Sequence, residues 1–470
     1  MKQSEKLSEE CAVFGISSTS DDTAGVVAGS LVALQHRGQE GAGLAVSCGR
    51  RILCVKNTGL VSEVLTPAVV QRLPACRAAI GHCRYSTTGS NTRENVQPFV
   101  TEYLTGRLAT AHNGNIVNAA TLRDVLRGAG VEFGATSDTE VISSLIAYET
   151  VKAGSPVLGA ARAARQLRGA FCLVILTSDE RVIAIRDPNG FRPLCIGENE
   201  TGTVVASESC ALASQGYRFV RDVAPGEMVV LQDGKLVSSE MIFRDRVDTG
   251  LCIFEFVYFA RTDSVIDGLS VYEARVNMGR MLAREYPVDA DIVCGIPDSG
   301  MEAALGYSLE SGIPMVPGFV KNKYIGRSFI FPTQRQRETA VKMKLNPLAA
   351  TLSGKRVILV DDSLVRGTTS AKIIQSVRDA GAAEVHMRIS SPPFTHTCHF
   401  GTDVDREDSL IANQMDLEGI RRHIGADSLG YISIAGLKSA CEGCRLHFCT
   451  GCFTGKYPVD PGLANKQELD

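Results

Sequence analysis

Apolar residues in the first half of the chain recur mostly with the two-residue period of β-strands. An alternating apolar run follows Cys11 directly, and the turn-rich stretch 35–43 separates it from the next such run. The stretch 26–34 instead carries apolar residues at helical spacing, which predicts a helix. Strands are predicted at 12–16, 44–46, 52–56, 78–80, 169–176 and 182–188.

In the second half, short apolar runs lead into polar turns and then into helices. The run 291–295 ends in a loop of Pro, Asp, Ser and Gly, and 357–360 is followed by Asp361 and Asp362. Continuous apolar runs are typical of parallel strands buried on both faces. A turn of Gly, Thr, Thr and Ser then opens a helix predicted at 371–380. This order favours an α/β domain with a parallel sheet.

The composition is that of a globular protein with several domains. The chain has 470 residues, 44% hydrophobic and 21% charged, with a mean hydropathy of +0.04 and a net charge of −3. This charge gives no reason to expect a nucleic acid or a membrane as the main partner. No apolar run approaches the ~18 residues of a membrane span. Residues 1–10 lack the apolar core of a secretory signal, so a cytoplasmic location is expected.

Fifteen cysteines are present, and their odd number and scatter do not suggest a disulfide framework. In a reducing compartment, thiolate chemistry, metal ligation and plain burial are the better explanations. Four of them form the dense pattern Cys441-x2-Cys444-x4-Cys449-x2-Cys452. This spacing suits zinc and an iron–sulfur cluster about equally, and neither accounts for Cys252 and Cys398.

Cys11 stands where a polar decapeptide meets the first strand. If cleavage after Glu10 frees it, its thiol shares a residue with a free α-amine. An unperturbed α-amine titrates near ~7.7–8.0 and can therefore serve as a base for that thiol. This is the logic of an N-terminal nucleophile, with residues 1–10 as a propeptide. The alternative is that Cys11 is a small buried apolar residue and that residues 1–10 are a tail.

Three polar stretches are predicted as loops, at 81–89, 111–116 and 136–140. Singly, Arg84 suits a surface charge, Asn113-Gly114 a hairpin turn and Asp138 a helix cap. Together they supply what amide hydrolysis by a thiol needs. An arginine binds a carboxylate and an aspartate binds an ammonium group. An Asn amide beside a Gly N–H forms an oxyanion hole worth on the order of 10²–10³ in rate per donor.

Asp361 and Asp362 stand at the C-terminal end of a predicted strand, where α/β sheets bind ligands. The hydroxyl-rich turn that follows opens a helix and suits a phosphate. The chain contains neither a Walker A pattern nor a GxGxxG fingerprint. Paired acids before a phosphate loop favour a phosphorylated sugar, with an ordinary capped turn as the alternative.

The motifs CAVFGI, HRGQEGAG, GHCRYSTTG, AHNGNI and TSDTE occur in this order, and they resemble the class II glutamine amidotransferase domain. That domain belongs to the N-terminal-nucleophile hydrolases, which have an αββα sandwich fold. The resemblance implies that Cys11 forms a γ-glutamyl thioester. It also implies that Arg84 and Asp138 hold the α-carboxylate and α-amino group of glutamine, and that Asn113 and Gly114 form the oxyanion hole.

The segment VILVDDSLVRGTTS resembles the phosphoribosyl-pyrophosphate (PRPP) signature of type I phosphoribosyltransferases. The resemblance implies that Asp361 and Asp362 contact the ribose and Mg²⁺, and that Ser299 lies on the metal side of a pyrophosphate loop. A flexible flap would include the basic run 335–344, for which a solvated helix face is the alternative. The implied PRPP-binding residues are Asp298, Ser299, Gly300, Lys321, Lys323, Tyr324, Asp361, Asp362, Arg366, Gly367, Thr368, Thr369 and Ser370.

A glutaminase half followed by a phosphoribosyltransferase half resembles the two-domain amidotransferases that commit PRPP to purine synthesis. The implied reaction converts glutamine, PRPP and water to 5-phosphoribosylamine, glutamate and pyrophosphate, with ammonia channelled between the two sites. The expected limits are 1–10 for the propeptide, 11–243 for the glutaminase and 244–470 for the phosphoribosyltransferase. The alternatives are a glutaminase that serves another acceptor and a PRPP-sensing regulator.

One branch of that family carries a propeptide and a [4Fe–4S] cluster. The resemblance implies one Mg²⁺ and one cluster per subunit, feedback inhibition by purine nucleotides and a homotetramer. Cys441 and Cys444 would then not be ligands. The implied cluster ligands are Cys252, Cys398, Cys449 and Cys452.

Overall fold

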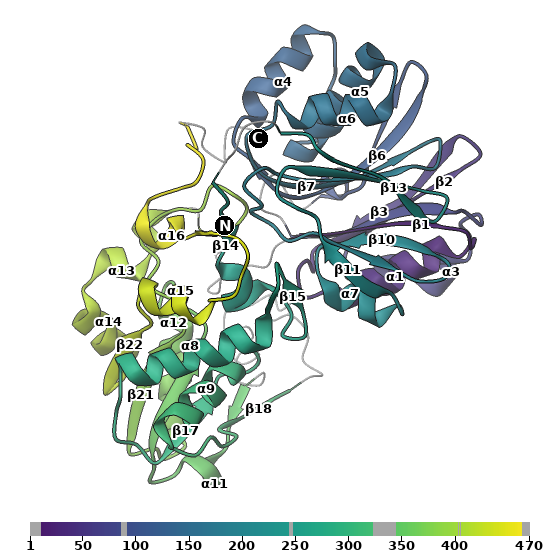
Figure 1. The fold of residues 1–470 in the computed structure, drawn as a ribbon. Coiled ribbons are helices and arrows are strands. Elements are labelled where there is room, and N and C mark those ends of the chain that lie inside the picture. The colour runs from purple at the N-terminus through teal and green to yellow at the C-terminus, as the bar shows by residue number, and fades with distance from the viewer. Residues whose placement is uncertain are drawn as a thin grey trace.

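A computed structural model describes residues 11–85, 92–243, 248–322, 345–402, 404 and 406–462. Figure 1 shows two parts that lie side by side. The purple-to-teal part is built on two stacked sheets, and the green-to-yellow part surrounds a parallel sheet. We call them the first half (residues 11–243) and the second half (248–462).

One sheet of the first half has seven strands in the order β11-β9-β10-β1-β4-β2-β3. β1 is central and pairs antiparallel with β10 and with β4. The strands are β1 Ala12–Ser18, β2 Gly41–Cys48, β3 Arg51–Thr58, β4 Ala78–Arg84, β9 Cys195–Glu198, β10 Gly202–Ala206 and β11 Arg218–Asp222. Its helices are α1 Thr23–Ala33, α2 Val61–Val64, α3 Pro67–Val70 and α7 Ser209–Ser214.

The other sheet has six strands in the order β13-β12-β8-β7-β6-β5. Its longest strand, β6, lies between β5 and β7. The strands are β5 Phe99–Tyr103, β6 Gly106–Ile116, β7 Gly169–Thr177, β8 Val182–Arg186, β12 Glu227–Gln232 and β13 Lys235–Met241. The helices are η1 Arg93–Asn95, α4 Ala119–Gly128, α5 Asp138–Ala153 and α6 Pro156–Ala164.

The central strands of the first half are buried on both faces. Val13 packs between the two sheets with Ala111 and Val174, whereas Phe14 points to the layer of α1 and α7. A third cluster fills the space between the six-stranded sheet and α4, α5 and α6. These three apolar layers give the αββα sandwich that the sequence predicts.

The second half is built around the parallel sheet β17-β20-β21-β22. Alternate residues of β20 feed two cores: Ile358 and Val360 face α8 and α9, and Val357 and Leu359 face α12 and α14. The sheet strands are β17 Ile292–Gly295, β20 Arg356–Asp361, β21 Glu384–Ile389 and β22 Ser428–Tyr431. The larger helices are α8 Val271–Glu285, α9 Met301–Ser311, α12 Thr368–Asp379, α14 Leu417–Ile424 and α15 Ile434–Ala440.

Short elements complete the second half. A parallel pair, β14 and β23, joins its beginning to its C-terminal part, with Cys252 opposite Cys449. The short strands are β14 Leu251–Cys252, β15 Val265–Ile266, β16 Leu269–Ser270, β18 Phe319–Lys321, β19 Leu345–Pro347 and β23 Phe448–Cys449. The short helices are η2 Glu255–Phe259, α11 Ala349–Leu352, η4 Glu407–Ser409, α13 Ile411–Gln414 and α16 Gly451–Thr454.

The structure corrects several sequence predictions of local structure, among them the loop at 136–140, because α5 already begins at Asp138. The stretch 111–116 lies inside β6, where Asn113 pairs with Cys172, so both the loop and the hairpin-turn interpretations are wrong. Residues 81–84 likewise end β4 and are not a loop. α12 begins at Thr368, earlier than predicted, because Gly367 adopts a left-handed conformation just before it.

The predicted domain boundary near Phe243 falls just before residues 244–247, outside the described ranges, and remains a prediction. No helix in the described part of the chain has the length and apolarity that a bilayer crossing requires.

Candidate active sites

Cys11 lies buried at the start of β1. Its Sγ donates to the carbonyl oxygen of Tyr85 at 3.4 Å. Its own carbonyl oxygen accepts a hydrogen bond from Nε of Arg37 at 3.1 Å, and Arg37 has no exposed surface. The thiol and the carbonyl oxygen of Cys11 are therefore both held by residues from other segments of the first half.

Arg84 ends β4, the antiparallel neighbour of β1, and is buried. Burial lowers the pKa of its guanidinium, whereas the nearby groups of Cys11, Glu40 and Asp138 raise it. Cys11 and Asp138 are therefore close enough to Arg84 to act on its charge. Three predicted glutamine-site residues, far apart in sequence, thus lie around one point.

Asp138 is the first residue of α5, and Ser137 caps that helix. Its Oδ2 accepts from the backbone N–H of Ile116 at 3.2 Å, and its Oδ1 lies 3.7 Å from Nδ1 of His112. Burial alone would raise the pKa of Asp138, but His112 and the hydrogen bonds outweigh it and hold the pKa below its usual range. The carboxylate therefore stays charged, as a partner for an ammonium group must.

Asn113 lies on β6 and is buried, and its side-chain Nδ2 has no hydrogen-bond partner among the described residues. A buried donor without a partner costs ~1–3 kcal/mol, so it calls for an explanation. Gly114, next to it, has φ +141°, and a Cβ there would lie 2.2 Å from the carbonyl oxygen of Ala170. Position 114 therefore accepts only glycine. The side-chain amide of Asn113 beside it can donate a hydrogen bond to a bound ligand.

The first half contains functional neighbours that the sequence analysis missed. Arg37 belongs to the HRGQEGAG motif, but the sequence analysis gives it no role, and no spacing signal reveals that its guanidinium reaches Cys11. His82 and His112 are also buried under the site: Nε2 of His82 lies 3.1 Å from the carbonyl oxygen of His112. Burial lowers the pKa of His82 to about 3, so this histidine is neutral.

In the second half, Asp361 ends β20 and Asp362 follows it, both buried. The backbone N–H of Asp362 donates to Oδ1 of Asp361 at 3.0 Å. Hydroxyls of Ser299 and Ser363 donate to the two carboxylate oxygens of Asp362. The loop after β17 therefore meets the end of β20, as expected for adjacent parallel strands.

Close backbone packing holds these two loops together. A Cβ on Gly300 would lie 2.3 Å from the carbonyl oxygen of Val360. Lys321 on β18 makes an ion pair with Asp298 across the same edge. Gly367 has φ +81°, and Thr368, Thr369 and Ser370 form the first turn of α12. Lys323, Tyr324 and the run 335–344 lie outside the described residues.

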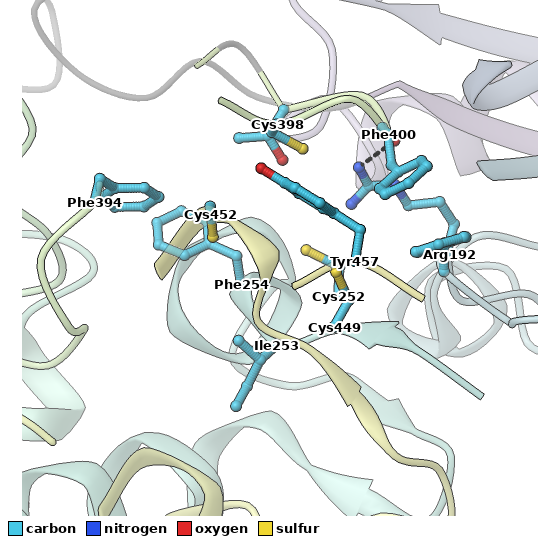
Figure 2. Close-up of a pocket in the computed structure, with 12 residues that line it drawn as sticks. Arg192, Cys252, Ile253, Phe254, Phe394, Cys398, Phe400, Cys449, Cys452 and Tyr457 are labelled. Carbon is cyan, nitrogen blue, oxygen red and sulfur yellow. Dashed lines mark hydrogen bonds between the residues drawn. The ribbon is translucent and has the colours of Figure 1, made fainter. Parts of the chain in front are cut away.

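Four cysteines from three segments line one small enclosed cavity: Cys252, Cys398, Cys449 and Cys452. Figure 2 shows sulfur atoms of these cysteines near the ring of Tyr457. Aromatic side chains, Arg192, Ile253 and Thr402 complete the lining, and Cys441 and Cys444 do not contribute to it. Burial raises the pKa of Cys449 to about 11, and the nearby Cys398 adds to this effect.

The donor set of this cavity fits an iron–sulfur cluster, which four cysteine thiolates hold. No group of three or more His, Cys, Asp or Glu side chains in the described ranges is placed to hold a single metal ion. The fit therefore rests on the four thiols that line the cavity. The β14–β23 pairing sets Cys252 opposite Cys449, and the backbone N–H groups of Thr395 and His396, just before Cys398, donate to the carbonyl oxygen of Cys452.

Comparison with known proteins agrees with the two halves. A glutamine amidotransferase domain family matches residues 82–214. The amidophosphoribosyltransferase of Synechocystis is 48% identical over 99% of this chain and 94% of the relative, and that of Methanocaldococcus jannaschii is 46% identical over 96% and 98%. A solved structure of glutamine PRPP amidotransferase from B. subtilis, complexed with ADP and GMP, matches with a TM-score of 0.88 and 41% identity, covering 97% of this chain and 99% of that one.

The fold is thus an N-terminal-nucleophile glutaminase sandwich followed by a phosphoribosyltransferase domain with a central parallel sheet. Its class is that of the glutamine-dependent amidotransferases. The chain belongs to the amidophosphoribosyltransferase family. This membership confirms the prediction of a purine-biosynthetic enzyme over a PRPP-sensing regulator or a glutaminase with another acceptor.

Proposed function

We propose that Cys11 attacks glutamine and that the ammonia released is used at the Asp361–Asp362 edge. The observation that carries this proposal is that Cys11 and Asp138 lie close to Arg84: Sγ of Cys11 donates to the carbonyl oxygen of Tyr85, the residue after Arg84, and Asp138 is near enough to raise the pKa of Arg84. A guanidinium and a carboxylate placed beside one thiol match the two charged ends of an α-amino acid. The reacting amide of glutamine would then lie over Cys11.

In the proposed reaction the Cys11 thiol loses its proton to the α-amine of the same residue and attacks the amide carbon. Nδ2 of Asn113 and the N–H of Gly114 donate to the oxyanion that forms. This gives Nδ2 of Asn113 the hydrogen bond that it lacks among the described residues. The proton then passes to the leaving nitrogen, the C–N bond of the tetrahedral intermediate breaks, and ammonia departs. A γ-glutamyl thioester of Cys11 remains, which water hydrolyses to glutamate and the free thiol.

This role requires that Cys11 be the first residue of the mature chain. In the full sequence its nitrogen is part of the peptide bond to Glu10 and cannot act as a base. We therefore propose that residues 1–10 are a propeptide and that the glutaminase comprises 11–243. Residues 244–470 would form the phosphoribosyltransferase.

For the second site we propose that Asp361 and Asp362 bind the ribose hydroxyls of PRPP. Arg366, Gly367 and the hydroxyls of residues 368–370 would hold its 5′-phosphate at the start of α12. The loop 298–300 and Lys321 would bind pyrophosphate, and Lys323 and Tyr324 would belong to a closing flap. Ammonia, channelled from Cys11, displaces pyrophosphate at ribose C1 in a site that excludes competing water.

Two resident groups are proposed. Oxygen atoms of Ser299, Asp361 and Asp362 suit Mg²⁺, which prefers such ligands and would offset the charge of the leaving pyrophosphate. Cys252, Cys398, Cys449 and Cys452 would hold a [4Fe–4S] cluster, whose role is to join three segments of the second half. One ion and one cluster per subunit are proposed.

We further propose feedback inhibition by purine nucleotides at or beside the PRPP site. The B. subtilis relative is described in complex with ADP and GMP, and a loop that holds a ribose 5-phosphate also suits a nucleotide. A homotetramer and a cytoplasmic location complete the proposal.

The Cys11→Ala variant tests the division of labour. We expect it to lose glutamine-dependent pyrophosphate release from PRPP and to keep release driven by free ammonia. The measurement is pyrophosphate production with either nitrogen source, beside wild type. Loss of both activities in a folded variant would contradict the proposal, as would unchanged use of glutamine.

A further inference from the structure

A fully buried ion-pair network connects the second half to Cys11. Glu255, the first residue of η2, has no exposed surface. Its Oε2 accepts from Nη1 of Arg37 and its Oε1 from Nη2, both at 2.8 Å. Since Nε of Arg37 donates to the carbonyl oxygen of Cys11, only one side chain separates Glu255 from Cys11.

We propose that Glu255 is a positioning residue for the nucleophile, an inference that rests on the proposed role of Cys11. The two parallel hydrogen bonds fix the plane of the Arg37 guanidinium. That plane fixes the carbonyl of Cys11 through the Nε–H of Arg37. The thiol and the α-amine of Cys11 are attached to the same Cα as this carbonyl, so its placement orients attacker and base together.

Glu208, the second carboxylate that pairs with Arg37, is also held by hydrogen bonds to other residues. It accepts from Nη1 of Arg37 at 2.6 Å, but also from Ser264 at 2.6 Å and from the backbone N–H of Arg261 at 2.9 Å. Burial would raise the pKa of Glu208, but His36 and Arg37 outweigh it and lower the pKa. Glu208 therefore stays charged and fixed, while the bidentate grip on Arg37 comes from Glu255.

The network continues to the cavity of cysteines. Nη1 of Arg192 lies 3.5 Å from Oε1 of Glu255, and its Nη2 donates to the carbonyl oxygen of Phe400 at 2.8 Å, the dashed line in Figure 2. Phe400 follows Cys398 by two positions, and both line the cavity. Glu255 therefore stands between the nucleophile and a segment of the second half.

A second buried ion pair between the halves provides a matched control. Arg186 and Asp267 form two hydrogen bonds, Nη2 to Oδ2 at 2.7 Å and Nη1 to Oδ1 at 3.1 Å. The other donors of Arg186 go to the carbonyl oxygens of Arg192, Val223 and Gly190. None of these bonds involves Arg37 or Cys11, so Asp267 shares the chemistry and the burial of Glu255 without its route to the nucleophile.

The experiment compares Glu255→Gln with Asp267→Asn in the mature full-length enzyme. We expect Glu255→Gln to lower kcat with glutamine by up to ~10²-fold, the scale of a small misplacement of reacting groups. The KM for glutamine should change little, because Arg84 and Asp138 are untouched. Pyrophosphate release driven by ammonia should remain, and labelling of Cys11 by a diazoketone analogue of glutamine should slow in step with kcat.

Asp267→Asn should lower Tm and leave the ratio of glutamine-driven to ammonia-driven rates at the wild-type value. If Glu255→Gln keeps that ratio as well, or changes it only through KM, the positioning role is wrong. Should Glu255→Gln not fold, Glu255→Asp keeps the charge on a shorter stem and must still lower the ratio; a wild-type ratio there overturns the inference. Failure of the proposed function itself would differ, because wild type would then not use glutamine or Cys11→Ala would still use it.

Discussion

The two sites are built in opposite ways. The proposed glutaminase site lies in the interior of the sandwich, with Asn113 and Gly114 paired to β7 near the end of β6 and Cys11 directly before the central strand β1. The PRPP edge lies where parallel strands stop, and Asp362 is held by hydroxyls of two loops. The first site is therefore fixed by sheet register, whereas the second is fixed by loops that meet at the sheet edge.

The largest effect is expected at the PRPP edge, from Asp362→Asn. The amide has the shape of the carboxylate but neither its charge nor its full capacity to accept from Ser299 and Ser363. We expect pyrophosphate release to be lost with glutamine and with ammonia alike, whereas hydrolysis of glutamine at Cys11 continues. Assaying glutamate and pyrophosphate in parallel checks this. Retained pyrophosphate release would place PRPP chemistry elsewhere.

A smaller and more selective effect is expected for Asn113→Ala. Loss of one oxyanion donor should lower kcat with glutamine by ~10²–10³ and leave ammonia-driven release intact. Because Nδ2 of Asn113 has no partner among the described residues, its removal should not lower the free energy of unfolding and should raise it slightly. Chemical denaturation measures this second result.

An unstable Asn113→Ala variant would mean that the amide is structural. Gly114→Ala provides a contrast at the next position, since its Cβ would strike the carbonyl oxygen of Ala170 and destabilise β6.

The smallest effect concerns acid. The folded protein cannot protonate His82 until the pH nears 3, whereas an unfolded chain takes up that proton near ~6.5. The pKa of this histidine is lowered on folding. Its contribution to the free energy of unfolding is therefore fully present above pH ~6.5 and is lost as the pH falls towards 3. The slope is up to ~1.4 kcal/mol per pH unit. His82→Gln should make unfolding free energies between pH 6 and pH 4 less dependent on pH.

His386→Gln, in β21 of the second half, is the matched control for acid sensitivity. Burial lowers the pKa of His386, with Arg388 adding to this and Glu384 opposing it. We expect a smaller change in slope than for His82. An equal change would mean that the deeper burial of His82 in the first half has no greater effect on acid sensitivity than the burial of His386 in the second half.

Sequence reasoning was strongest where local pattern decides structure. The run 357–360 ends at Asp361 as predicted, because four apolar residues before two acids define both a strand and its end. It was wrong for Asn113-Gly114, since this dipeptide, typical of turns, pairs here with Cys172 and Phe171 of β7, a strand that the local sequence does not reveal. Such pairing partners lie far along the chain and decide the outcome.

The spacing of cysteines along the chain likewise could not predict which of them lie together in the fold. The pattern of four C-terminal cysteines gave no reason to prefer Cys449 and Cys452 over Cys441 and Cys444, and only the family resemblance added Cys252 and Cys398. The parallel pairing of β14 with β23 explains why Cys252 lies beside Cys449, because it sets the two residues opposite each other. Glu255 carried no signal at all, because nothing in its neighbourhood points to a residue at the other end of the chain.

The place of β1 has a consequence for synthesis on the ribosome. β1 is the first strand to emerge, yet the backbone N–H of Val13 donates to a hydroxyl of Ser207, 194 positions away. At ~5–20 residues per second, one edge of β1 stays open for roughly 10–40 s before β10 exists. An open apolar edge can pair with other chains. Nascent chains that stop short of residue 206 should therefore be the species that aggregate.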